Sequence, residues 1–215
     1  MVPQTDVSLL LQPRAPLPQT DRLLLAAAVA RVCAVDLTAV TIEQRCERCG
    51  GAHGRPRVLT PGGVHVSLSR AGRTVVVAVS QVGPIGVDLE SVASVARAGF
   101  DDVAFNADER TALAELPVDE RDRARAALWT TKEALLKLSG EGLTVDPREV
   151  TVALGPGGAS VEREASARAG GSALLSWPTA TLDLSRVHVV GFHAGPGLVG
   201  TLALLGPRAP SLSML

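Results

Sequence analysis

The sequence predicts an α+β fold, in which helices and mainly antiparallel strands share one chain. In each half of the chain, a helical stretch is followed by several strand-like segments. Hydrophobic residues make up 46% of the 215 residues and aromatic residues only 2%, with no Tyr, so a core of Val, Leu and Ala is expected. The repeated order of elements indicates a duplicated α+β unit, although no sequence repeat accompanies it.

The first half begins with a proline-rich arm over residues 1–19, which we expect to be extended. Thr20 or Asp21 is suited to cap a Leu- and Ala-rich helix that runs to about Val35. Residues 43–63 contain several Gly and Pro residues and are expected to form a loop. Three strands should follow, at 64–69, 74–80 and 85–90.

The second half begins with helices. Asn106 or Asp108 is suited to cap a short helix that ends near Pro117. A longer helix is expected over 119–139, and Gly140 would end it. The remaining segments have the composition of strands, and they cover 149–154, 173–184, 187–193 and 198–205.

Composition and charge exclude several classes of protein. The formal net charge is −1, from 21 basic and 22 acidic residues, so the basic excess of a general nucleic-acid binder is missing. The longest apolar run, over 23–30, is far shorter than the ~20 residues of a membrane helix. The N-terminus lacks the pattern of a secretory signal. We therefore expect a cytoplasmic protein with no nucleic-acid or membrane partner. A duplicated single chain would form its cleft without a partner chain, so we also expect a monomer.

Two short segments carry the chemistry. Asp88 and Glu90 are two apart at the end of an apolar run, so on a strand both side chains project from one face. Glu133 and Lys137 are four apart on a helical stretch and share a helix face. Carboxylates with a nearby ammonium suit a hard divalent cation and the phosphate it carries. The alternative is that the carboxylates simply mark a strand end, and that Glu133 and Lys137 form an exposed pair worth about 0.2–0.5 kcal/mol.

Taken together, these segments resemble the paired signature of the larger, Sfp-like 4′-phosphopantetheinyl transferases. Residues 86–90 read G-V-D-L-E, and residues 129–137 read W-T-T-K-E-A-L-L-K, followed by G-E-G-L at 140–143. Upstream, Gly54-Arg55-Pro56 is similar to the family's G-K-P motif. Residues 66–69, which read V-S-L-S, are similar to the strand that leads to the family's S-H motif. The ordered match covers roughly residues 46–145 by motif.

The resemblance implies a fold of two similar α/β halves related by a pseudo-twofold axis, with the active cleft between them. We expect the halves at 1–111, with the coenzyme A loop and the Asp/Glu strand, and at 112–215, with the signature helix. Members move the phosphopantetheine arm of coenzyme A to a serine of an apo acyl or peptidyl carrier protein and release 3′,5′-ADP. Such carriers act in polyketide, nonribosomal-peptide and fatty-acid assembly.

The resemblance also implies roles for single residues. Asp88, Glu90 and Glu133 match the family's ligands for Mg²⁺, with Mn²⁺ as an alternative metal. Glu133 is then the candidate base for the serine hydroxyl, and Glu109 is the alternative base. Lys137 matches a lysine at the departing phosphate. The remaining residues implied to contact coenzyme A are Arg55, Pro56, Ser69, Arg70, Asp88 and Lys132.

The chain departs from the family pattern at two phosphate-contacting positions. Arg70 stands where S-H has His, and Arg55 stands where G-K-P has Lys. Arginine keeps the positive charge and offers a fixed fork of donors, so we expect both residues to contact phosphate. The alternative for each is a solvated loop arginine. Trp129 is expected to pack in the core rather than take part in chemistry.

Cysteines suggest a second reading of the chain. Cys46, Cys49 and His53 form C-x₂-C-x₃-H, and Cys33 lies upstream, so the four could complete a tetrahedral zinc shell. Cys33, however, lies in an apolar helix, where cysteine acts as a small hydrophobic residue. We therefore expect no zinc here and reduced loop cysteines. The competing hypotheses are a zinc-stapled module that binds a protein partner, and a catalytically inactive relative of the transferases.

Overall fold

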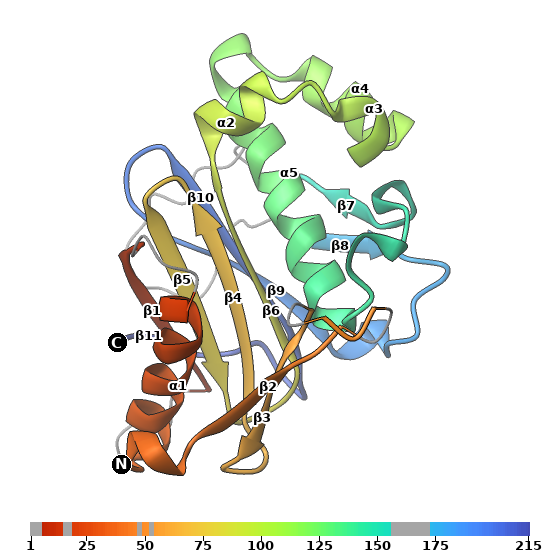
Figure 1. Cartoon of the computed structure of the whole chain (residues 1–215). Helices are drawn as coiled ribbons and strands as arrows, with labels where there is room; N and C mark the ends of the chain where they lie inside the picture. The colour runs from red at the N-terminus through yellow and green to blue at the C-terminus, as the bar shows by residue number, and fades with distance from the viewer. Residues whose placement is uncertain (1–5, 15–18, 47–48, 52–53, 156–172) are drawn as a thin grey trace.

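Two helix-covered sheets make up the fold of this protein (Figure 1). The structure, a computed structural model, describes residues 6–14, 19–46, 49–51, 54–155 and 173–215. In this part of the chain, no helix is long and apolar enough to cross a membrane.

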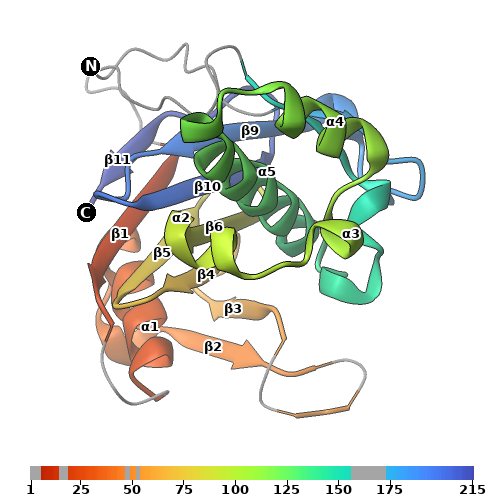
Figure 2. The ribbon, with the colours of Figure 1, turned by 90° about the horizontal axis from the view of Figure 1, so that it is seen from above.

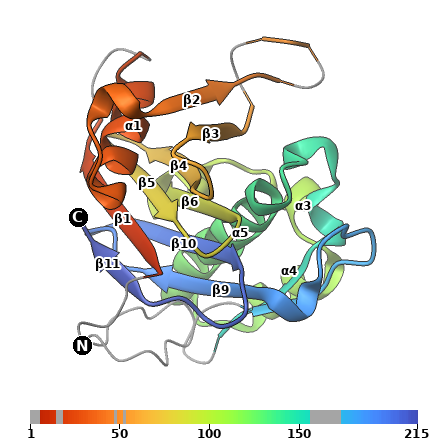
Figure 3. The ribbon, with the colours of Figure 1, turned by 90° about the horizontal axis from the view of Figure 1, so that it is seen from below.

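The first sheet has the strand order β11-β1-β5-β4. Its strands are β1 (Val7–Pro13), β4 (His65–Ala71), β5 (Thr74–Ser80) and β11 (Leu212–Met214). All neighbours are antiparallel except β1 and β11, which pair in parallel and so bring the C-terminal strand to the N-terminal sheet. Helix α1 (Gln19–Cys33) lies against β4 and β5, as the view from below shows (Figure 3).

The second sheet has the order β6-β10-β9 and is antiparallel throughout. Its strands are β6 (Ile85–Ser91), β9 (Val187–Phe192) and β10 (Leu198–Leu205). Helix α5 (Val118–Ser139) crosses this sheet on β6 and β10 (Figure 2). Strand β4 of the first sheet lies beside β6 of the second, and the Ser67 hydroxyl accepts a hydrogen bond from the Val87 amide across that junction.

Shorter elements complete the fold. Helices α2 (Val92–Arg97), α3 (Asp101–Ala104) and α4 (Ala107–Glu115) lead from β6 to α5. Strands β2 (Thr41–Gln44) with β3 (Pro56–Thr60), and β7 (Thr151–Ala153) with β8 (Ala173–Ser176), form two-stranded sheets. The 3₁₀ turns are η1 (Leu37–Ala39), η2 (Gly142–Thr144), η3 (Pro147–Glu149) and η4 (Leu184–Arg186).

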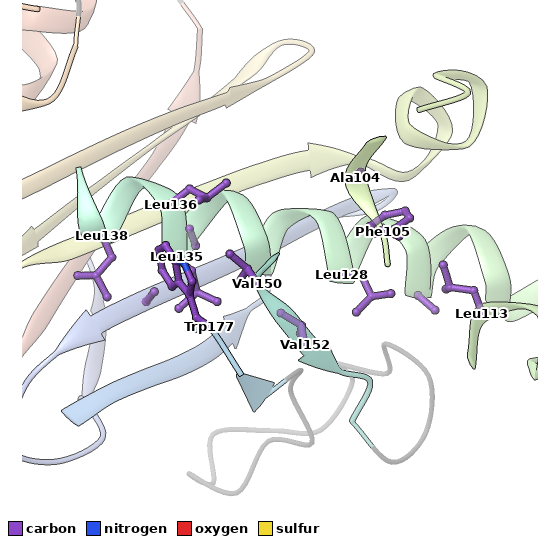
Figure 4. Close-up of a cluster of buried hydrophobic side chains, with 13 residues drawn as sticks. Ala104, Phe105, Leu113, Leu128, Leu135, Leu136, Leu138, Val150, Val152 and Trp177 are labelled. Atoms are coloured by element: carbon purple, nitrogen blue, oxygen red, sulfur yellow. The ribbon is translucent and has the colours of Figure 1, made fainter. Parts of the chain in front are cut away.

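Aliphatic side chains fill the core, as the composition predicts. On β5, Val75, Val77 and Val79 pack toward α1, whereas Val76 and Ala78 pack toward the second sheet, so the strand is buried on both faces. Around α5, a further cluster of Leu, Val and most of the few aromatic side chains joins the helix to β7 and β8 (Figure 4).

The predicted α+β fold with mainly antiparallel sheets is confirmed. Its long helices and the strands β4, β5, β6, β9 and β10 lie within a few residues of their expected places. Two expectations were wrong in extent. The expected loop at 43–63 contains β3, and the expected strand at 173–184 ends at Ser176. The predicted division of the chain at 111/112 stays a prediction. Two strands of the first part, β6 and β1, pair with β10 and β11 of the second.

Candidate active site

The site begins where α5 packs against β6. A Cβ on Gly86 would lie 2.0 Å from the Ala134 carbonyl oxygen and 2.6 Å from the Leu138 nitrogen, so only glycine permits this approach. The close contact brings the turn of α5 that carries Glu133 and Lys137 next to the strand that carries Asp88. It explains the glycine that opens the motif at residues 86–90.

Asp88 is the centre of a buried hydrogen-bond network. Its side chain is only 4% exposed, and its Oδ1 accepts hydrogen bonds from the Ser69 hydroxyl (2.7 Å) and from Lys137 Nζ (2.6 Å). Lys137 Nζ also donates to Ser69 Oγ (3.2 Å) and to the Val87 carbonyl oxygen (3.2 Å). The structure thus joins Ser69, Asp88 and Lys137 from β4, β6 and α5.

The carboxylates beside this network are held near one another at an electrostatic cost. Burial, followed by the negative charge of Asp88, raises the pKa of Glu90, and the positive charge of Lys137 opposes this rise. Burial and the charges of Asp88 and Glu90 raise the pKa of Glu133 to about 7, although Lys137 lowers it. Burial also raises the pKa of Asp88 against the effect of Lys137. A positive charge brought to these carboxylates would relieve the repulsion.

A cavity of about 1340 Å³ opens in front of the carboxylates, between the two helix-covered sheets. Residues of α1, β3, β4, β6 and α5 line it. Asp88, Glu90, Glu133 and Lys137 contribute to its wall. The lining arginines are Arg22, Arg45, Arg55, Arg57 and Arg70. A cavity lined by both carboxylates and arginines suits a ligand with several negative charges that binds together with a cation.

Arg55 and Arg70, at which the chain departs from the family pattern, both line this cavity, as does Pro56. Arg70 donates through Nε to Asp21 of α1 at 2.9 Å and forms an ion pair with it. Burial and the nearby charge of Arg57 lower the pKa of Arg55, and no ion pair or hydrogen bond joins Arg55 to another residue in the described ranges. Both guanidinium groups are therefore available to an anion, Arg70 after exchange with Asp21.

Lys132 and Glu109 lie elsewhere. Both side chains are buried, at 0% and 2% exposed, and Lys132 Nζ lies 2.6 Å from Glu109 Oε2. Lys132 also donates to the carbonyl oxygens of Ala104 and Pro147. Glu109 accepts from the Val152 amide and from the Asn106 amide in the capping box of α4.

Lys132 was expected to contact phosphate, and Glu109 was expected to be the alternative base. Their observed positions differ from both expectations. Neither of them is among the residues that line the cavity. The reason is helix geometry. Residues adjacent on a helix are about 100° apart around its axis, so Lys132 points into the core while Glu133 borders the cavity. We correct the two expectations accordingly and assign Lys132 and Glu109 to the packing of α4, α5 and β7.

The oxygen donors at the cavity fit a divalent cation. Asp88 Oδ2 and Glu133 Oε1 are buried without a hydrogen-bond partner among the described residues, which is costly unless something binds them. Within the same residues, no group of three or more His, Cys, Asp or Glu side chains is arranged so that it could hold a metal as it stands. Mg²⁺ nonetheless fits, because it commonly takes one or two carboxylates and completes its shell with water and substrate phosphates.

The three cysteines lie in different surroundings. Cys33 packs against the aliphatic cluster under α1, as expected of a small hydrophobic residue. Cys46 lines the cavity and Cys49 is exposed. His53, the third member of the suggested zinc motif, lies outside the described residues, so the zinc hypothesis stays untested.

Sequence reasoning missed two contributions to this site. Ser69 lines the cavity and its contact with coenzyme A stays a prediction, but its hydrogen bond to Asp88 was not foreseen. Trp129 packs against Phe100, as expected of a core residue. Glu141 lines the cavity, and the sequence analysis quoted it within the G-E-G-L match without giving it a role. A signal for Glu141 was present, since it directly follows the glycine that ends α5.

Comparison with known proteins places this geometry in a family. The sequence model of the 4′-phosphopantetheinyl transferase superfamily matches residues 84–190, which include Asp88, Glu90, Glu133 and Lys137. The chain is 30% identical over 142 residues to the 4′-phosphopantetheinyl transferase psf-1 of Bacillus pumilus, covering 66% of this chain and 60% of that protein.

A second relative is the 4′-phosphopantetheinyl transferase of Bacillus subtilis. It is 30% identical over 96 residues, which cover 43% of this chain and 41% of that protein. The chain thus matches less than two thirds of the length of each relative. The matched segment contains β6 and α5, the two elements that form the carboxylate wall of the cavity. On this evidence, the chain belongs to the 4′-phosphopantetheinyl transferase superfamily.

Proposed function

We propose that this protein transfers the 4′-phosphopantetheine arm of coenzyme A to a serine of an apo acyl or peptidyl carrier protein, with Mg²⁺, and releases 3′,5′-ADP. The observation that carries the proposal is the wall of the cavity where Asp88, Glu90, Glu133 and Lys137 meet. The relatives named above are transferases of this kind, and their activity is extended here to this chain. The carriers would be those of polyketide, nonribosomal-peptide or fatty-acid assembly.

The charges of the cavity suit coenzyme A. Its phosphates need cations, and the arginines of the lining supply permanent positive charge with a planar set of donors. Arg55 has no counter-ion in the described residues, so a phosphate would give it one. Arg70 would reach a phosphate by giving up its bond with Asp21. Pro56, which begins β3 beside Arg55, would form part of the wall for the same molecule.

Asp88, Glu90 and Glu133 would hold the divalent cation. Support comes from the unpartnered buried oxygens of Asp88 and Glu133, and from the raised pKa values of all three groups. When bound, such a cation would screen the negative charge of the pyrophosphate that is cleaved. Mn²⁺ prefers the same oxygen ligands and would be an alternative.

Glu133 is suited to accept the proton of the incoming serine hydroxyl. A pKa of about 7 means that near neutral pH the carboxyl group exists in both protonation states, which is the range in which a general base is effective. Lys137 already uses Nζ for Asp88, Ser69 and the Val87 carbonyl. Exchange of one of these bonds would let it donate to the departing phosphate while the other two keep it in place.

The proposal is tested by mixing the protein with coenzyme A, Mg²⁺ and apo carrier proteins of the three assembly types. We expect the intact mass of at least one carrier to rise by one phosphopantetheine arm, with an equal amount of 3′,5′-ADP. Omission of the divalent cation should prevent the change. If no carrier gains mass, the proposal is wrong.

The same preparation separates the competing hypotheses. A zinc-stapled binding module would contain stoichiometric zinc and would not bind coenzyme A in calorimetry. A catalytically inactive relative would bind coenzyme A and leave every carrier unmodified. The transferase should bind coenzyme A and modify the carrier, whatever its zinc content.

A further inference from the structure

One carboxylate in the cavity has no role in the proposed reaction. Glu141 follows α5 and lines the cavity, and its Oε2 is buried without a hydrogen-bond partner in the part of the chain that the structure describes. A buried carboxylate oxygen without a donor destabilises the protein, because the desolvation of that oxygen is not offset. A hydrogen-bond donor on the ligand would satisfy this acceptor in the wall of the cavity.

The turn that carries Glu141 is held in place. The Glu141 amide donates to the Ser139 hydroxyl at 3.2 Å, and the Glu141 carbonyl oxygen accepts from the Thr144 hydroxyl at 2.7 Å. Gly140, on its N-terminal side, has φ +84°, a left-handed conformation that glycine adopts without strain. The main chain of Glu141 is thus fixed before any ligand binds, which lowers the entropic cost of recognition.

A guanidinium group lies beside this turn. A Cβ on Gly140 would be 3.2 Å from Arg55 Nη1, so the Arg55 side chain passes directly over the residue before Glu141. Arg55 offers only donors and Glu141 only acceptors. The two are not joined by an ion pair among the described residues. Two such groups, close together yet unpaired, fit a ligand that has an acceptor for Arg55 and a donor for Glu141.

The nucleoside end of coenzyme A has this combination. Its phosphate oxygens are acceptors, and its adenine amine and ribose 2′-hydroxyl are neutral donors. A carboxylate repels phosphate, so Glu141 would favour one of these neutral groups over any phosphate of the molecule. A carboxylate acceptor also rejects a ligand that lacks the donor, because its own oxygen is then left unpaired.

We propose that Glu141 is a specificity-determining residue of this site, and that its carboxylate accepts a hydrogen bond from a neutral donor on the nucleoside end of coenzyme A. The proposal rests on the proposed function for the identity of the ligand. The donor is either the adenine amine or the ribose 2′-hydroxyl, and Arg55 binds a phosphate beside it.

The test is calorimetric binding of three ligands to the full chain and to its Glu141→Ala and Glu141→Gln variants. The ligands are coenzyme A, its analogue with unsubstituted purine in place of adenine, and its 2′-deoxyribose analogue. For the unmodified chain, we expect one analogue to bind about 10- to 100-fold more weakly than coenzyme A. In Glu141→Ala, coenzyme A should weaken to the level of that analogue, so that this discrimination is lost.

The analogue that loses its disadvantage identifies the donor, purine for the adenine amine and 2′-deoxyribose for the hydroxyl. Glu115→Gln, on the exposed end of α4, is the matched control and should change nothing. If the unmodified chain and Glu141→Ala discriminate equally between coenzyme A and both analogues, the inference is wrong. Binding is measured without a carrier, so failure of the transfer assay would leave this test intact.

A second readout excludes a purely structural role. In the transfer assay, Glu141→Ala should raise KM for coenzyme A about 10- to 100-fold while kcat and the dependence on Mg²⁺ stay near those of the unmodified chain. A fall in kcat with unchanged KM would instead place Glu141 in the chemical step and contradict the proposal.

Discussion

Lys132 and Glu133 are adjacent in the sequence, yet their surroundings are opposite. Lys132 is fully buried and has an ion-pair partner, Glu109, and two carbonyl acceptors. Glu133 borders the cavity, has an unpartnered oxygen, and has a pKa raised to about 7. On one side of α5, the buried ammonium group therefore has hydrogen-bond and ion-pair partners, whereas on the other side a carboxylate oxygen has none among the described residues. Polar groups that the fold leaves unsatisfied are the ones expected to bind ligands.

The largest effect on transfer is expected from Asp88→Ala. This change removes the acceptor of both Ser69 and Lys137, together with an unpartnered oxygen that faces the proposed cation. We expect kcat/KM to fall at least about 10³-fold, since several kcal/mol of charge stabilisation are lost. Circular dichroism should show an unchanged fold. Asp119→Ala, in the first turn of α5, is the matched control and should keep full activity.

On the opposite side of α5, Lys132→Met should act on stability. The change leaves the buried Glu109 without its cation, and breaking such a pair costs about 3–5 kcal/mol. Urea unfolding should show this loss, and the double variant Lys132→Met, Glu109→Gln should recover part of it. Single variants as stable as the unmodified chain would contradict the structural role of the pair.

Glu133→Gln tests the cost of an unsatisfied carboxylate. The folded-state pKa of about 7 lies above the usual value of 4.5, so the folded chain binds more protons than the unfolded chain between these values. The free energy of unfolding should therefore fall as pH rises from about 4.5 to about 7 in the absence of divalent cation. Glu133→Gln removes this dependence and should be more stable than the unmodified chain at alkaline pH, by on the order of 2 kcal/mol. If the free energy of unfolding depended on pH equally in Glu133→Gln and in the unmodified chain, folding would not raise the pKa of Glu133.

The smallest effect is expected from Arg70→Ala. Arg70 already has Asp21 as a partner, and other arginines line the same cavity. We expect KM for coenzyme A to rise about tenfold with kcat nearly unchanged, since one charge-assisted hydrogen bond is lost. Arg73→Ala, in the exposed turn between β4 and β5, is the control. An unchanged KM in Arg70→Ala would return Arg70 to the role of a solvated loop arginine.

The carboxylate face of the site was predictable from local periodicity. Asp88 and Glu90 are two apart on a strand, and Glu133 and Lys137 are four apart on a helix, so each pair had to share a face. Packing was not predictable in the same way. Both Lys132 and Lys137 belong to the same helical motif, and only the contact of α5 with β6 at Gly86 decides which lysine reaches the cavity.

Long-range pairing also escaped prediction. Residues 7–13 were expected to be an extended arm, but β1 is held by β5 on one side and by β11, more than 200 residues away in the chain, on the other. Such contacts depend on the whole topology rather than on any local pattern. The proposed role of Glu141 was hidden for a similar reason, because it depends on the side chain of Arg55, which precedes β3 and lies at the same turn.

The most direct test of the account is a carrier-loading assay, read by intact mass, that compares Asp88→Ala with Lys132→Met under conditions where both variants are folded. We expect folded Asp88→Ala to leave the carrier unmodified, and folded Lys132→Met to add the phosphopantetheine arm at a rate per folded molecule close to that of the unmodified chain. Normal loading of the carrier by Asp88→Ala, or inactivity of fully folded Lys132→Met, would show that the roles assigned to the two sides of α5 are wrong.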